Sequence, residues 1–136
     1  MKSNKRDRAG VAAVELAVLL PFIMFLCVIS TDWARCLQTT LSAEACARNG
    51  ALYASDLVTR NMSPYASLQD AAMAECPEYA STATVTQSSV TDSAGNAAVV
   101  VTVSIQFKTL TNFPGVPQIN NLVRTCQMRV APLATR

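Results

Sequence analysis

The strongest constraint on this chain is an apolar run long enough to cross a lipid bilayer. Residues 11–29 hold one charged side chain, Glu15, and a helix of that length spans about 28 Å, close to the hydrocarbon thickness of a membrane. A carboxylate within a span costs about 2.5–3.5 kcal/mol on insertion scales, so Glu15 calls for a favourable partner. Asp32, Trp33 and Arg35 follow the run, where polar and aromatic interface residues are expected.

Basic residues precede the apolar run, and no comparable cluster follows it closely. Lys2, Lys5, Arg6 and Arg8 are opposed only by Asp7 in this short segment. Because positive charge is retained on the cytoplasmic side of a membrane, we predict a cytoplasmic N-terminus and export of the chain after about residue 30.

Three kinds of protein begin in this way. A cleaved secretory signal peptide fits poorly, because the run exceeds the usual length of roughly 7–15 residues and STDWARC at residues 30–36 is a poor cleavage site. A plain signal anchor fits the run but explains neither Gly10 nor Glu15. The third kind depends on a resemblance described below.

Beyond the apolar run the chain has room for one small domain, because it has 136 residues in all. Apolar residues recur at helical spacing, at Trp33, Leu37, Leu41, Ala45 and Leu52. We predict one continuous helix from about residue 11 to about residue 54, with this apolar stripe covering a sheet. Pro21 is a candidate kink.

The rest of the chain changes from a helical to a strand period. We predict, in chain order, a connector at 55–63, a short helix that starts with the Ser67–Asp70 capping pattern and ends near Pro77, a strand at 82–90, a turn at 92–96, a strand at 98–110, a loop at 111–121 and a strand at 122–130. The fold class is therefore α+β: a long N-terminal transmembrane helix that continues into a small exported domain with a short second helix and about three antiparallel strands.

Five cysteines are distributed along the chain. Cys27 lies in the apolar run and is read as a small buried hydrophobe. Cys36 and Cys46 are about 15 Å apart on one helix and cannot pair with each other. Cys76 and Cys126 are the preferred disulfide, with Cys46 an alternative partner for either of them. The odd total leaves at least one thiol free or intermolecular.

The composition argues against catalysis. The chain has no histidine, no C-x-x-C pair and no glycine-rich phosphate-binding loop, so the usual general base, metal ligands and cofactor motifs are missing. We expect no enzyme activity, no metal, no cofactor and no small-molecule substrate. Nucleic-acid binding is not expected either, since the basic cluster is short and cytoplasmic.

Gly10 followed by VAAVE, with glutamate as the fifth residue after the glycine, resembles the type IV prepilin signal. The wider stretch RAGVAAVELAVLLPFIMFLCVI, residues 8–29, resembles the TadE-like pseudopilins of tight-adherence pilus systems. The matching residues are Arg8, Gly10, Val14, Glu15, Leu16, Ala17, Val18, Leu20 and Pro21. Leu16 departs from the aromatic residue that often follows the glutamate, which leaves the choice between TadE and TadF open.

The resemblance implies three parts: a basic prepilin leader at 1–10, a transmembrane helix at 11–30 and an exported pilin-like domain at 31–136. It implies that prepilin peptidase cuts between Gly10 and Val11. The product would be a minor pilin or pseudopilin in the bacterial inner membrane, with a periplasmic domain. Its expected partners are the peptidase, other pilins or pseudopilins and the pilus assembly platform, and its expected role is assembly of a pilus for surface attachment. Whether it enters the surface fibre or only primes assembly stays open.

The residues have a physical reason to act together. Cleavage would free an α-amine at Val11, one helical turn from Glu15, and this cation or that of a neighbouring subunit would compensate the carboxylate. Gly10 would let a peptidase draw the backbone close. The alternatives are an uncleaved bitopic subunit of an envelope or type II secretion complex, and a secreted binding domain starting after residue 30.

Overall fold

A computed structural model describes residues 4–111 and 119–131 of the chain. The elements are α1 (Asn4–Ser55), α2 (Leu57–Met62), α3 (Leu68–Met73), a 3-10 turn (Pro77–Tyr79), β1 (Thr84–Thr91), β2 (Ala97–Lys108) and β3 (Ile119–Arg129). The side chains of residues 1–9, with the predicted basic leader, and most of the predicted 111–121 loop lie outside the described part.

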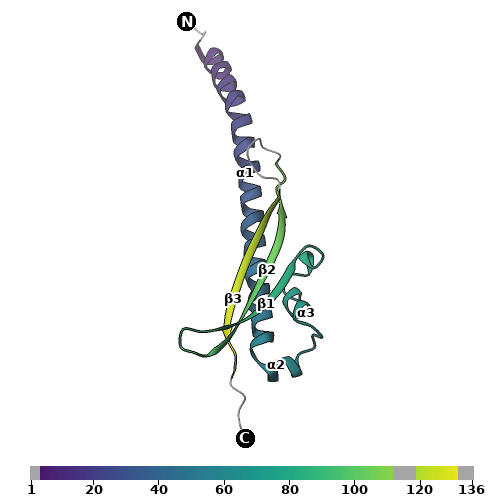
Figure 1. The fold of residues 1–136 in the computed structure, drawn as a ribbon. Coiled ribbons are helices and arrows are strands. Elements are labelled where there is room, and N and C mark those ends of the chain that lie inside the picture. The colour runs from purple at the N-terminus through teal and green to yellow at the C-terminus, as the bar shows by residue number, and fades with distance from the viewer. Residues whose placement is uncertain (1–3, 112–118, 132–136) are drawn as a thin grey trace.

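Helix α1 runs along most of the molecule, and the sheet and short helices lie beside its C-terminal half (Figure 1). The layout confirms the predicted α+β class. The helix starts at Asn4, earlier than predicted, and ends at Ser55, one residue beyond the prediction. It continues on both sides of Pro21.

The sheet has three antiparallel strands in the order β1-β2-β3. The predicted turn at 92–96 joins β1 to β2, and Gly95 there has φ +81, a conformation that favours glycine. Alternate residues of β2 are buried, from Val99 to Phe107, as the period-two pattern predicts. The three predicted strands are confirmed, with ends shifted by up to three residues.

The face of α1 that covers the sheet differs from the predicted one. The large residues Trp33, Leu37, Leu41 and Leu52 are between 48% and 66% exposed. The buried face instead consists of small residues: Ala43, Cys46, Ala47, Gly50 and Ala51. The prediction that the large apolar stripe covers the sheet is wrong.

Close approach of the elements explains this choice. A Cβ on Gly50 would lie 3.2 Å from a methyl carbon of Val101 and 3.3 Å from the Cβ of Ala72. Such spacing leaves room for alanine, cysteine and glycine between helix and sheet but not for leucine or tryptophan. Trp33, Leu37, Leu41 and Leu52 therefore stay outside this contact and are exposed.

Each of the two short helices begins after a residue whose side chain caps it. Ser67 begins α3: its Oγ accepts a hydrogen bond from the Asp70 N–H (3.1 Å) and donates to the Asp70 carboxylate (2.7 Å). The helix ends at Met73, four residues before the predicted end near Pro77. Helix α2 lies in the predicted connector at 55–63 and was missed, although Asp56 caps it by accepting from the Val58 N–H.

The disulfide joins Cys46 of α1 to Cys76, just after α3, with 6.3 Å between their Cα atoms. The preferred Cys76–Cys126 pairing is therefore wrong, and the alternative through Cys46 is the one formed. Helix α3 packs directly on α1, where the Asn49 side chain donates to the Ala71 carbonyl at 2.6 Å, so Cys76 meets α1. Cys126 is a free, half-buried thiol opposite Val101, and Cys27, expected to be buried, is exposed within the chain.

Candidate processing and assembly site

The predicted processing position lies inside α1. Helix geometry runs without a break from Asn4 through Gly10 and Val11. A Cβ placed on Gly10 would meet no atom within 4 Å, and the Val11 side chain is exposed. The described part of the chain therefore contains no packing reason for glycine at this position.

Glu15 lies one helical turn beyond Val11, on the same face of α1. It borders a shallow hollow with Val14, Val18 and Leu19. Residues 10–31 are exposed without exception, and Glu15 is the one acid among them. The ion pairs between described side chains are Asp32–Arg35 and Asp92–Arg129, so Glu15 has no charged partner among those side chains.

The exposed segment is long and apolar enough to cross a membrane. Its last polar residues are satisfied within the helix: the Ser30 hydroxyl donates to the Leu26 carbonyl (2.8 Å) and the Thr31 hydroxyl to the Cys27 carbonyl (2.9 Å). Buried structure begins at Asp32. The exposed apolar segment therefore ends directly where buried structure begins.

Asp32 ties the helix to the sheet at this boundary. Its carboxylate accepts hydrogen bonds from the Leu110 N–H (3.0 Å), the Thr111 N–H (3.0 Å) and the Thr111 hydroxyl, and it lies 3.4 Å from Arg35. The Thr111 hydroxyl, then the Leu110 N–H, hold the pKa of Asp32 below its usual value. This role has no local signal in the sequence, because the partners lie nearly 80 residues away in the chain.

The exposed apolar surface continues past Asp32 on the other side of α1. Trp33, Leu37 and Leu41 extend it along the C-terminal half of the helix, where all three are exposed. A continuous apolar helix face of this kind is suited to packing against another helix.

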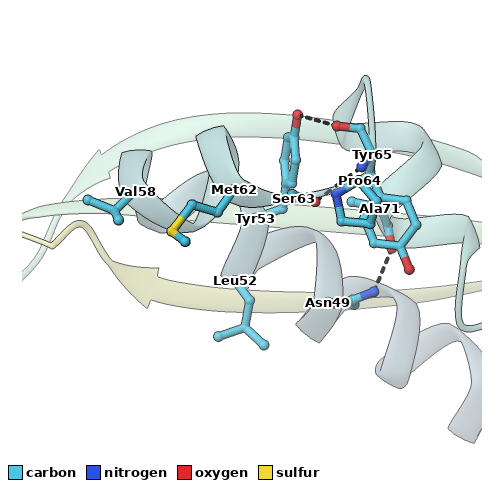
Figure 2. A pocket seen from close by; sticks show the side chains of 9 residues that line it. All are labelled: Asn49, Leu52, Tyr53, Val58, Met62, Ser63, Pro64, Tyr65 and Ala71. Atoms are coloured by element: carbon cyan, nitrogen blue, oxygen red, sulfur yellow. Dashed lines mark hydrogen bonds between the residues drawn. The ribbon is translucent and has the colours of Figure 1, made fainter.

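An apolar hollow of about 430 Å³ lies near the C-terminal end of α1 (Figure 2). It is lined by Asn49, Leu52, Tyr53, Val58, Met62, Ser63, Pro64, Tyr65 and Ala71. Asn49 donates to the Ala71 carbonyl and the Tyr53 hydroxyl to the Tyr65 carbonyl, so hydrogen bonds between its walls occupy these two polar side chains. The hollow brings together no nucleophile and base.

The structure brings some predicted site residues together and separates others. Gly10, Val11 and Glu15 share two turns of α1, and Cys46 is bonded to Cys76, whereas Cys126 is left out. Across residues 4–111 and 119–131, no three side chains of the metal-ligating types gather at one point.

Comparison with known proteins gives one match. The family model described as TadE-like protein matches residues 10–52. No curated protein and no solved structure matches the chain. The matched span starts at Gly10, contains Glu15 and Pro21 and ends three residues before the end of α1. The segment from Gly10 to Leu52 is therefore TadE-like, as the residues around Gly10 and Glu15 indicate.

Proposed function

We propose that this chain is a TadE-type pseudopilin that takes part in assembling a tight-adherence pilus for surface attachment. Its role is structural rather than catalytic. The observation that carries the proposal is the family match, which begins at the glycine where processing is expected and covers the apolar run 11–29 with its one acid, Glu15.

The proposed maturation is removal of residues 1–10 by a prepilin peptidase. The freed amine of Val11 would lie on the same helix face as Glu15, and the pair would compensate each other's charge in lipid. A neighbouring subunit can supply the amine instead, in which case the pair sets the stagger between subunits. A Cβ on Gly10 would meet no atom of the described residues within 4 Å, which supports a requirement from outside the fold.

The helical conformation at the processing position adds a requirement for cleavage. The bond between Gly10 and Val11 lies within α1, where the backbone is hydrogen-bonded. A peptidase must draw this backbone into its own cleft, so cleavage requires local unwinding. Glycine reduces the cost of unwinding by about 0.5–1 kcal/mol relative to alanine.

The proposed location is the bacterial inner membrane, crossed once by residues 11–30. The exposure of the whole segment supports burial in lipid, and the basic residues before it support a cytoplasmic N-terminus with the exported domain in the periplasm. The exposed face at Trp33, Leu37 and Leu41 supports contacts with other pilin helices, and the assembly platform is the expected machinery.

The decisive experiment is to determine the N-terminus of the protein purified from its native membrane, by intact mass and N-terminal fragment sequencing, with and without the host's prepilin peptidase. A peptidase-dependent start at Val11 supports the proposal. A start at Met1 or Lys2 would instead indicate an uncleaved bitopic subunit, and a start beyond residue 30 a secreted domain.

A substitution tests the processing position directly. In Gly10→Leu the bulky side chain should hinder approach of the peptidase, so we expect the leader to stay on most molecules. Intact mass of the membrane fraction measures this, with Glu15→Ala as the control that should still be cleaved. Efficient maturation of Gly10→Leu would contradict cleavage at this bond.

A further inference from the structure

A polar cleft lies at the end of the exported domain that is nearest the apolar segment. Its volume is about 450 Å³. It is lined by Arg35, Gln38 and Thr39 of α1, by Glu78, Tyr79 and Thr82 around the 3-10 turn and by Gln106, Phe107 and Lys108 of β2. The proposed pilin function uses none of these residues.

The walls of the cleft are fixed by contacts between the elements. The Thr39 and Tyr79 hydroxyls are hydrogen-bonded at 3.1 Å, which joins α1 to the 3-10 turn. The guanidinium carbon of Arg35 lies 5.5 Å from the centre of the Phe107 ring, which is buried. Arg35 is thereby held in place, with a cation–π contact on one side.

The height of the cleft matches the headgroup layer of a membrane. Arg35 lies six residues beyond Ile29, a rise of about 9 Å, and the headgroup region extends about 5–8 Å beyond the hydrocarbon on each side. Helical side chains tilt toward the helix N-terminus, which is the membrane side here, and the contact of Arg35 with Asp32 runs in that direction. Lys108 lies two residues before Leu110, which binds Asp32, so it stands near the same level.

The cleft carries both signs of charge. Arg35 and Lys108 supply cations, Glu78 supplies a carboxylate, and glutamine and hydroxyl groups supply further donors. The Asp32 carboxylate is already taken up by N–H groups, the Thr111 hydroxyl and Arg35. Two bases with one acid suit a group with one phosphate and one ammonium better than a group with two negative charges.

We propose that this cleft binds the phosphoethanolamine headgroup of a membrane phospholipid, with the phosphate on Arg35 and Lys108 and the ammonium at Glu78. This inference rests on the proposed membrane anchor and its orientation. Such a contact would hold the exported domain at a set angle to the bilayer surface.

The experiment uses the full chain in detergent, with phosphatidylethanolamine added and bound lipid measured by native mass spectrometry. Lys108→Gln should retain about fivefold less of this lipid, the effect of one base near a lipid surface. Arg48→Gln is the matched control, because Arg48 is an exposed base of α1 outside the cleft. Equal retention by the two variants would overturn the proposal.

A second variant tests the ammonium position with an effect that unfolding cannot imitate. Glu78→Gln should lower the ratio of bound phosphatidylethanolamine to phosphatidylglycerol by about fivefold, because the acid no longer disfavours the anionic headgroup. An unchanged ratio would overturn the ammonium assignment. Displacement of the lipid by inorganic phosphate alone would show a site for a soluble anion and overturn the lipid assignment.

A failure of the lipid site can be distinguished from a failure of the pilin proposal. Alkaline carbonate extraction of native membranes shows whether the chain is anchored at all. Release of the wild-type chain would remove the membrane anchor and with it the pilin proposal. An anchored chain in which Lys108→Gln and Arg48→Gln behave alike would contradict the lipid site alone.

Discussion

At the scale of single residues, Glu15 has no charged partner among the described side chains. It is the one acid on the exposed apolar surface between Gly10 and Thr31. A carboxylate there is costly in lipid unless a cation meets it. The cation expected from processing is the amine of Val11, or that of a second subunit.

We therefore expect Glu15→Ala to insert into the membrane and to be cleaved normally, yet to impair pilus assembly severely. Immunoblots of membrane fractions, counts of surface pili and an adhesion assay measure the three steps. Glu44→Ala is the control, because Glu44 is an exposed acid in the C-terminal half of α1. Normal pili on cells carrying Glu15→Ala would contradict the pairing.

Asp32 is a second single residue with a testable role, which is to stabilise the fold. Its carboxylate is bound by the backbone of Leu110 and by both the backbone and hydroxyl of Thr111. Asp32→Asn replaces one acceptor oxygen by a donor amide that faces donors, so the denaturation midpoint of the folded domain should fall. Urea unfolding followed by circular dichroism measures this, with Glu44→Gln as control.

Asp32 also makes the stability of the folded chain depend on pH. The Thr111 hydroxyl, followed by the Leu110 N–H, lowers the pKa of Asp32 in the folded chain, so its stabilisation is complete above the unfolded pKa of about 3.9 and is lost as the pH falls through the lower folded value. Acidification through this range should therefore lower the free energy of unfolding more in the wild type than in Asp32→Asn. Equal acid sensitivity of the two would contradict the assignment.

At the scale of elements, α1 has two different faces in its C-terminal half. Small residues such as Ala47 and Gly50 pack against β2 and α3, and large ones such as Leu37 and Leu41 remain exposed. The helix thus combines a close-packed side for its own domain with an apolar side available to other subunits.

A pair of substitutions tests the two faces separately. Ala47→Glu buries an unpaired charge in the core and should cost at least about 3 kcal/mol of folding free energy. Leu41→Glu changes an exposed position and should alter stability by no more than about 0.5 kcal/mol while impairing assembly. Urea unfolding and counts of pili measure the two effects, and normal piliation with Leu41→Glu would argue against the exposed face as a subunit contact.

At the scale of the whole molecule, several hydrogen bonds and a disulfide hold distant segments to α1. Asp32 binds the residues after β2, and Cys46 is bonded to Cys76 across a separation of 30 residues. Both disulfide cysteines are fully buried. These two contacts hold the sheet and α3 to α1, which is also the proposed anchor.

Loss of the disulfide should weaken this arrangement. A loop of this length contributes about 3.5 kcal/mol in the chain-entropy model, so a Cys46→Ala/Cys76→Ala double variant should lose about 3 kcal/mol of unfolding free energy. Urea unfolding measures it, with Cys36→Ala, at a free thiol, as control. Non-reducing digestion should yield a Cys46–Cys76 peptide, and a Cys76–Cys126 peptide instead would contradict the assigned pairing.

The local pattern of the chain determined its long apolar helix, its TadE-like N-terminal segment and its strands. The apolar run, the Gly10-to-Glu15 spacing and the alternation of β2 are each encoded within a few neighbouring residues, so they are readable from sequence. The Ser67 start of α3 is local for the same reason.

Tertiary structure decided which face of α1 is buried, which cysteine bonds to Cys76 and what Asp32 binds. Two periodic stripes run along the C-terminal half of α1, one of large residues and one of small residues, and periodicity alone does not show which of them is buried. Which stripe is buried depends on how closely β2 and α3 approach Gly50. Likewise, Cys46 and Asp32 meet partners 30 and nearly 80 residues away, and only the packing of those elements on one helix brings the atoms within bonding distance.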